Sequence, residues 1–100
     1  MKVWLDDCRP MPKGYDLHVK TVEEAINVLK TGMVEEMSFD HDLDSLVETG
    51  YHVAVWVEKA AAEGSLKPFV WHVHSANVVG AMRIKKALEK ANEYWRENDE

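Results

Sequence analysis

Three short, mainly apolar runs at residues 3–5, 37–39 and 69–73 each end abruptly in side chains that carry charge or hydrogen-bonding groups. Runs of this length, containing valine and aromatic residues, are typical of buried strands. In an open sheet of parallel strands the carboxyl ends lie along one edge, and ligands bind at that edge. The chain is therefore expected to form a sheet with a polar site at one edge.

The segments between these runs have apolar residues at helical spacing. Helices are predicted at residues 21–32, 53–64 and 77–95, and a fourth, peripheral strand at residues 17–19. The proline-rich loop at residues 7–16 is short for a parallel crossover, so the direction of that strand stays open. The order strand, strand, helix, strand, helix, strand, helix predicts an α/β fold with a mostly parallel four-stranded sheet and three helices.

Composition limits the class of protein. The chain of 100 residues, with a net charge of −6, is the size of one domain, and we expect a single domain over residues 1–100 with a frayed tail at 95–100. The negative charge argues against a bulk nucleic-acid-binding surface. One cysteine, an N-terminus that soon becomes charged and the absence of a long apolar run predict a cytoplasmic protein without membrane contact. Oligomeric state is not indicated.

Four carboxylates follow two of the predicted strands. Asp6 and Asp7 follow the strand at residues 3–5, and Asp40 and Asp42 follow the strand at residues 37–39. If these strand ends converge, mutual repulsion would keep some carboxylates protonated unless a cation neutralised them. Mg²⁺ or Mn²⁺, held by carboxylates, water and a substrate phosphate, is the expected cofactor. The nearby histidines leave Zn²⁺ open. The alternative for the Asp40–Asp42 segment is a solvated acidic turn.

The remaining polar residues at the strand ends each have two readings. Arg9 either pairs with a neighbouring aspartate or binds a phosphate. Ser75 and Asn77 either cap the last helix or bind phosphate oxygens, and the two roles are compatible because a helix N-terminus attracts anions. His74 lies at a strand end, where a functional role is expected, whereas His72 lies within the strand and is expected to be structural.

Three motifs together resemble a known family, the cyclic-phosphate-processing receiver-like domains. They are Leu5-Asp6-Asp7-x-Arg9-Pro10, Ser38-Phe39-Asp40-His41-Asp42-Leu43 and His74-Ser75-x-Asn77. The resemblance runs from about Val3 to Trp95. It implies a small three-layer receiver-like (flavodoxin-like) sheet and a role in processing nucleotides or RNA ends that carry cyclic phosphates. Compared with ordinary receivers, a proline-rich loop replaces the first crossover helix, and nothing after the last helix supplies the lysine that contacts the phosphoryl group.

These observations lead to the hypothesis of a metal-dependent phosphoesterase that opens a small cyclic phosphate, either a cyclic nucleotide or a 2′,3′-cyclic phosphate at an RNA end. Water or Asp40 attacks phosphorus, and His41 or His74 protonates the leaving oxygen. Asp42 either joins the metal ligands or orients a histidine. The residues expected to hold the substrate phosphate are Arg9, Ser75 and Asn77.

Two rival functions follow from the same residues. One is a signalling receiver that takes up a phosphoryl group on Asp40, for which ordinary receivers provide the model. The other is a non-catalytic module that binds a cyclic nucleotide. The missing lysine argues against a stable phosphorylated aspartate, although the Arg9 guanidinium is able to clamp two phosphate oxygens in its place.

Overall fold

The computed structural model describes residues 1–43, 45 and 47–98. Its strands and helices follow the predicted order, and their bounds are β1 Lys2–Leu5, β2 Leu17–Val19, α1 Val22–Lys30, β3 Glu36–Phe39, α2 Gly50–Glu63, β4 Val70–Val73 and α3 Val78–Asn98. Thr21 and Thr49 are the N-caps of α1 and α2, because their side chains accept hydrogen bonds from the first-turn amides. The predicted loop before α2 includes residues 44 and 46, which lie outside the described residues.

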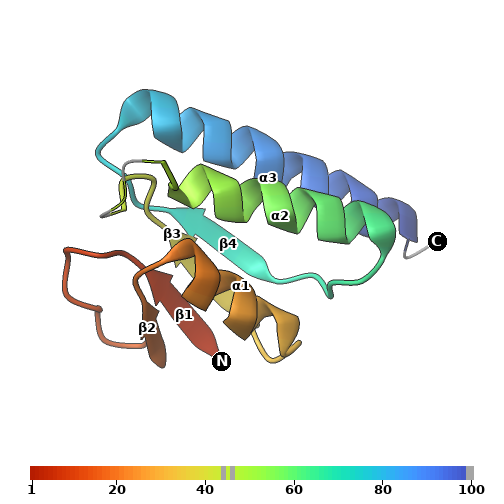
Figure 1. Cartoon of the computed structure of the whole chain (residues 1–100). Helices are drawn as coiled ribbons and strands as arrows, with labels where there is room; N and C mark the ends of the chain where they lie inside the picture. The colour runs from red at the N-terminus through yellow and green to blue at the C-terminus, as the bar shows by residue number, and fades with distance from the viewer. Residues whose placement is uncertain (44, 46, 99–100) are drawn as a thin grey trace.

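The four strands form one sheet in the order β2-β1-β3-β4, and every neighbouring pair is parallel. The direction of the second strand is thereby decided. The connections from β2 to β3 and from β3 to β4 both cross the sheet toward the β4 edge (Figure 1). Since parallel crossovers are right-handed, both connecting helices lie on the same face of the sheet.

One face of the sheet carries the hydrophobic core. Val3, Leu5, Met37 and Phe39 have no exposed surface and pack in a single cluster with the buried side chains of all three helices. On the same face the Trp71 indole donates a hydrogen bond of 3.2 Å to Asn92 in α3. Because side chains alternate along a strand, the intervening residues project from the opposite face.

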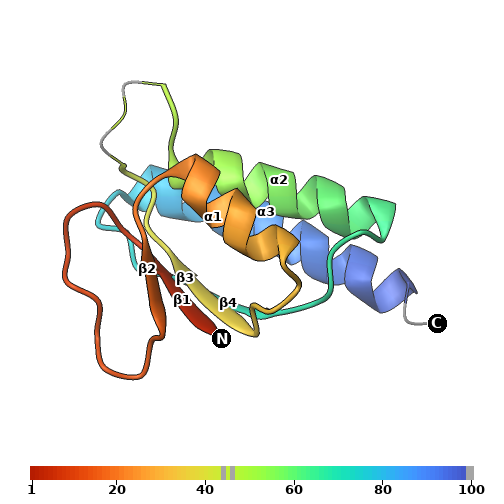
Figure 2. The same cartoon turned by 60° about the horizontal axis from the view of Figure 1, so that its bottom comes forward.

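The α/β class, the parallel four-stranded sheet, the three helices and the receiver-like architecture are confirmed. The layering is simpler than the expected three layers, because α1, α2 and α3 all lie on one side of the sheet (Figure 2). The proline-rich loop between β1 and β2 connects the strands without a helix, and its Tyr15 packs edge-on against Trp4 on the other face. That helix-free face carries the polar residues described below.

Helix α3 continues past the point where a frayed tail was expected. Trp95 is buried and its indole nitrogen donates a hydrogen bond of 2.9 Å to the Leu66 carbonyl, while the Asn98 amide donates one of 3.0 Å to the Ala61 carbonyl. Residues 95–98 therefore belong to α3 and contact the rest of the fold, and residues 99–100 lie outside the described part. No helix among the described residues is long and apolar enough to span a bilayer.

Two helical glycines allow the helices to approach the loop after β3. The amide of Gly50 donates a hydrogen bond of 2.8 Å to the His41 carbonyl, and a Cβ at this position would overlap the Asp40 carbonyl oxygen. A Cβ at Gly80 would overlap the His41 ring. The first turns of α2 and α3 are thus held against the residues that follow β3.

Replacing Gly50 by alanine is expected to destabilise the domain by about 1–3 kcal/mol, because the added methyl must displace backbone. Helix propensity alone predicts the opposite sign, since alanine is favoured over glycine by about 1 kcal/mol within a helix. Urea unfolding distinguishes the two. The control is Val55→Ala, at an exposed position of the same helix. A Gly50→Ala variant as stable as the parent would contradict the close approach of α2.

Candidate functional site

Three polar residues meet at the carboxyl edge of the sheet because of strand register. Leu5 pairs with Phe39, and Phe39 with Val73, so the next residue of each strand is Asp6, Asp40 or His74. All three project from the helix-free face, and each offers a ligand atom within 4.8 Å of the others. The predicted convergence of the three strand ends is what the structure shows.

The Asp6 carboxylate is fully buried, and both of its oxygens accept hydrogen bonds. One oxygen accepts hydrogen bonds of 2.8 Å from the amides of both Cys8 and Arg9. The other accepts bonds from the Arg9 guanidinium at 3.2 Å and from His74 Nε2 at 3.0 Å. Burial by itself raises the pKa of Asp6, but the hydrogen bonds from Arg9, Cys8 and His74 outweigh it and the pKa lies below its ordinary value. Asp6 is therefore an ionised anchor.

Asp40 has the opposite electrostatic environment. Burial raises its pKa, and the negative charge of Asp6 raises it further. A hydrogen bond of 2.9 Å from the His41 amide, a side-chain hydrogen bond from Ser75 and the Arg9 guanidinium at 3.7 Å offset these effects only in part. The two neighbouring carboxylates thus differ in proton affinity, and Asp40 is the one whose negative charge lacks full compensation.

The Arg9 guanidinium bridges two strand ends. Its Nη1 atom lies 3.2 Å from the Asp6 carboxylate and 3.1 Å from the His74 carbonyl oxygen. Arg9 therefore pairs with Asp6, which is one of the two roles that the sequence left open for it. The side chain is still 44% exposed, so a bound anion is able to reach the guanidinium from solvent.

His74 is held between two hydrogen-bonding partners. Its Nε2 atom lies 3.0 Å from Asp6, and its Nδ1 atom lies 2.7 Å from the hydroxyl of Ser38. Burial lowers the pKa of His74, and the attraction of Asp6 for the charged ring offsets this only in part. His72 is separate from this group, since it is half-exposed and lies 3.6 Å from Glu36.

A second group joins the loop after β3 to the start of α3. The Asp42 carboxylate lies 2.8 Å from Nδ1 of His41 and accepts a hydrogen bond of 3.2 Å from the side-chain amide of Asn77. Both contacts hold the pKa of Asp42 below its ordinary value. Of the two roles left open for Asp42, these contacts support the orientation of a histidine. Asn77 also caps α3, because its side-chain oxygen accepts a bond of 2.9 Å from the Gly80 amide.

The carboxylates surround a hollow of about 390 Å³ at the carboxyl edge of the sheet. Asp7 and Asp42 line it, although neither belongs to the compact group of three ligand atoms. Neither His41 nor His74 is among its lining residues, which are Asp6, Asp7, Cys8, Arg9, Asp40, Asp42, Leu43 and Ala76. An oxygen-rich hollow with one guanidinium fits a hard divalent cation, because the acids outnumber the compensating positive charge.

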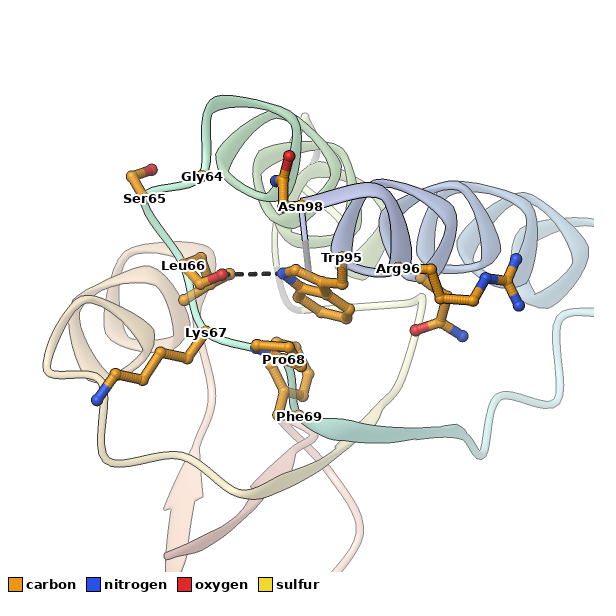
Figure 3. Close-up of a pocket in the computed structure, with 10 residues that line it drawn as sticks. Gly64, Ser65, Leu66, Lys67, Pro68, Phe69, Trp95, Arg96 and Asn98 are labelled. Atoms are coloured by element: carbon orange, nitrogen blue, oxygen red, sulfur yellow. Dashed lines mark hydrogen bonds between the residues drawn. The ribbon is translucent and has the colours of Figure 1, made fainter. Parts of the chain in front are cut away.

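A larger hollow of about 730 Å³ lies at the opposite end of the sheet, around the end of α3 (Figure 3). Its polar groups already have partners within the protein: the Trp95 indole donates to the Leu66 carbonyl, and the Asn92 and Asn98 side chains bond to Trp71 and to the Ala61 carbonyl. Lys67 and Arg96 on its rim point away from each other in Figure 3. Of these two hollows, the one at the carboxyl edge groups carboxylates with a guanidinium.

Sequence reasoning missed several residues that shape this edge. Trp4 stacks on His74 with 3.7 Å between the ring centroids, and His18 Nε2 lies 2.6 Å from the Asp6 carbonyl oxygen. Strand alternation places Trp4 and Ser38 on the face of Asp6 and Asp40, and this signal is available in the sequence. The contact of Gly80 with His41 joins distant segments and leaves no local signal.

Comparison with known families agrees with this geometry. A family model described as the cyclic-phosphate processing receiver domain matches residues 1–90. The chain belongs to this family. The resemblance inferred from the three motifs is confirmed. Neither the search of curated proteins nor the search of solved structures found a match. In this receiver domain Asp6 follows β1 and Asp40 follows β3, so the motifs on which the resemblance was based lie at the converging strand ends.

The unequal carboxylates predict how stability depends on pH. Because the pKa of Asp40 in the folded state lies above its ordinary value of 3.8, the folded domain binds this proton more tightly than the unfolded chain. The contribution of Asp40 to stability is thus lost as pH rises from about 4 through the raised pKa. In metal-free buffer at pH 7, Asp40→Asn is expected to raise Tm by several degrees, measured by calorimetry.

The matched control for this variant is Asp42→Asn. The pKa of Asp42 is lowered, so its ionised form stabilises the fold at pH 7, and the substitution is expected to lower Tm slightly. A fall in Tm for Asp40→Asn in metal-free buffer would show that the buried charge is already compensated.

Proposed function

We propose that this receiver domain is a metal-dependent phosphoesterase that opens a small cyclic phosphate ester at the hollow on the carboxyl edge. The observation that carries the proposal is the pair of buried carboxylates Asp6 and Asp40, whose pKa values are shifted in opposite directions beside a partly exposed Arg9. Oppositely shifted titratable groups at one hollow are typical of acid–base chemistry. The family description supplies the cyclic phosphate.

The proposed cofactor is Mg²⁺ or Mn²⁺, with Asp40, Asp7 and Asp6 as the ligands. When bound, such a cation polarises a phosphoryl oxygen and lowers the pKa of coordinated water. Asp40 is the strongest candidate ligand, because a neighbouring cation would relieve the repulsion from Asp6. The four hydrogen bonds on Asp6 hold its carboxylate in place beside Asp40.

The protein groups have separable tasks in this reaction. Arg9 binds a non-bridging phosphate oxygen through the exposed part of its guanidinium, and Ser75 lies beside Asp40 for the same purpose. Water adds to phosphorus, one ester bond to the ribose breaks, and the released oxygen takes up a proton. His74, hydrogen-bonded to Asp6, and His41, held by Asp42, are the proposed proton donors.

A panel of 2′,3′-cyclic and 3′,5′-cyclic nucleotides, with and without Mg²⁺ or Mn²⁺, tests the proposal. New phosphomonoester is expected from at least one cyclic nucleotide and only with metal. Changing the proton donor, His41 or His74, to alanine is expected to slow turnover by about 100-fold or more. His72→Ala is the matched control, since His72 belongs to β4, two residues before His74, and its ring lies beside Glu36 instead of Asp6. Full activity in all three variants would overturn the histidine assignment.

The cation itself is tested by thermal unfolding. Millimolar Mg²⁺ or Mn²⁺ is expected to raise Tm at neutral pH, because binding to the folded state alone stabilises it by a few kcal/mol at about 100-fold excess over Kd. The double variant Asp7→Asn with Asp40→Asn is expected to lose most of this increase. Arg83→Gln, on the exposed surface of α3, is the control for non-specific ion effects. An unchanged Tm in the parent protein would exclude the proposed metal site.

A signalling receiver is the second candidate, and the position of Asp40 at the end of β3 favours it. The Arg9 guanidinium, 3.7 Å from the Asp40 carboxylate, is placed to compensate a phosphoryl group on that residue. Intact-mass spectrometry after treatment with acetyl phosphate and Mg²⁺ separates the two candidates. A long-lived phosphoryl adduct that disappears in Asp40→Asn, together with no opening of any cyclic nucleotide, would favour signalling.

A further inference from the structure

A continuous chain of hydrogen bonds runs under the hollow on the helix-free face of the sheet. Asp6 lies 3.0 Å from Nε2 of His74, and Nδ1 of the same ring lies 2.7 Å from the Ser38 hydroxyl. Ser38 is 2% exposed, so a substrate cannot reach its hydroxyl. Ser38 therefore acts through its hydrogen bond to His74.

The proton positions in this chain follow from the chemistry of its ends. The ionised Asp6 carboxylate only accepts hydrogen bonds, so Nε2 of His74 must be the donor. A neutral imidazole carries one N–H, so Nδ1 is an acceptor and the Ser38 hydroxyl donates to it. Exchange of Ser38 for a residue without a hydroxyl would leave Nδ1 as an acceptor without a partner, and Asp6 alone would then hold the ring by a hydrogen bond.

Trp4 fixes the plane of the same ring. Its indole stacks on the His74 imidazole with an interplanar angle of 8°. The indole Nε1 atom is buried without a hydrogen-bond partner within the described part of the chain. The contact of Trp4 with His74 is therefore made by the flat face of the indole.

We propose that Ser38 and Trp4 are positioning residues that hold His74 as the Nε2–H tautomer directed at Asp6. Asp6 accepts the Nε2 proton, Ser38 holds the opposite edge of the ring through Nδ1, and Trp4 restrains rotation of the ring. The register of the sheet allows these contacts, because Trp4 pairs with Ser38 and Ser38 pairs with His72. Since His74 lies two residues after His72, its side chain is on the same face as Trp4 and Ser38. The expected effect on turnover rests on the proposed function, whereas the position and tautomer of His74 rest on the contacts with Asp6, Ser38 and Trp4 alone.

The first test is a long-range ¹H–¹⁵N NMR spectrum of the histidine side chains, recorded at neutral pH in EDTA. In the parent protein His74 is expected to show a protonated Nε2 and an unprotonated Nδ1. Ser38→Ala is expected to shift the Nδ1 resonance of His74, which loses its hydrogen bond, and to broaden the ring signals, whereas Ser38→Thr keeps the hydroxyl and retains the parent pattern. His18, whose Nε2 bonds to the Asp6 carbonyl oxygen, is the internal control and should not change.

Two variants of Trp4 separate the ring face from the indole donor. Trp4→Phe keeps an aromatic face and is expected to leave the His74 signals sharp and in the parent pattern. Trp4→Leu removes the planar contact and is expected to broaden or shift them. Circular dichroism confirms that each variant is folded before its spectrum is interpreted, and a variant that does not fold is replaced by Trp4→Tyr or Trp4→Met respectively.

Turnover of a cyclic nucleotide provides a second readout. Ser38→Ala and Trp4→Leu are expected to lower kcat by about 10- to 100-fold with KM nearly unchanged, as for residues that orient a functional group. An unchanged Nδ1 resonance and line width of His74 in Ser38→Ala overturns the positioning role, even if turnover falls. Absence of turnover in the parent protein, together with the expected change of the His74 signals in Ser38→Ala, overturns the proposed function and leaves the positioning role standing.

Discussion

The buried carboxylate of Asp6 is the group on which the rest of the site depends. A fully buried anion is stable only when its oxygens are hydrogen-bonded, and Asp6 accepts bonds from two amides, a guanidinium and an imidazole. Those four bonds fix the turn after β1, the position of Arg9 and the orientation of His74. Loss of this one carboxylate would remove the acceptor that two amides, a guanidinium and an imidazole share.

The charge of Asp6 also determines the character of its neighbour. Asp40 is buried beside it, and burial together with the adjacent negative charge raises its pKa. The same residue type therefore serves as an ionised anchor at one strand end and as a group with a strong affinity for a proton or a cation at the next. This difference arises from their surroundings, because Asp6 receives three hydrogen bonds from its own turn and one from His74, whereas Asp40 receives fewer.

The one-sided packing of the helices gives the site its access to solvent. Most parallel sheets are covered on both faces, with the carboxyl edge as the opening. Here α1, α2 and α3 share one face, and the loop between β1 and β2 brings Tyr15 against Trp4 on the other. Trp4, Ser38 and His74 thus form a small packed layer of their own, which supports the floor of the site without a covering helix.

The sequence by itself determined the class of fold, the order of the elements and the convergence of Asp6, Asp40 and His74, because strand alternation and parallel register are properties of local pattern. It also indicated the family, since the three motifs stand at the strand ends. It did not determine that all three helices lie on one face of the sheet or that α3 extends to Asn98. It also did not determine the different surroundings of the Asp40 and Asp42 carboxylates. Those were decided by tertiary contacts, in which Asn98 bonds to Ala61, and Asp42 to Asn77, across long separations in the chain. The hydrogen-bond partners of each polar group set its charge and orientation, and only the folded chain brings those partners together.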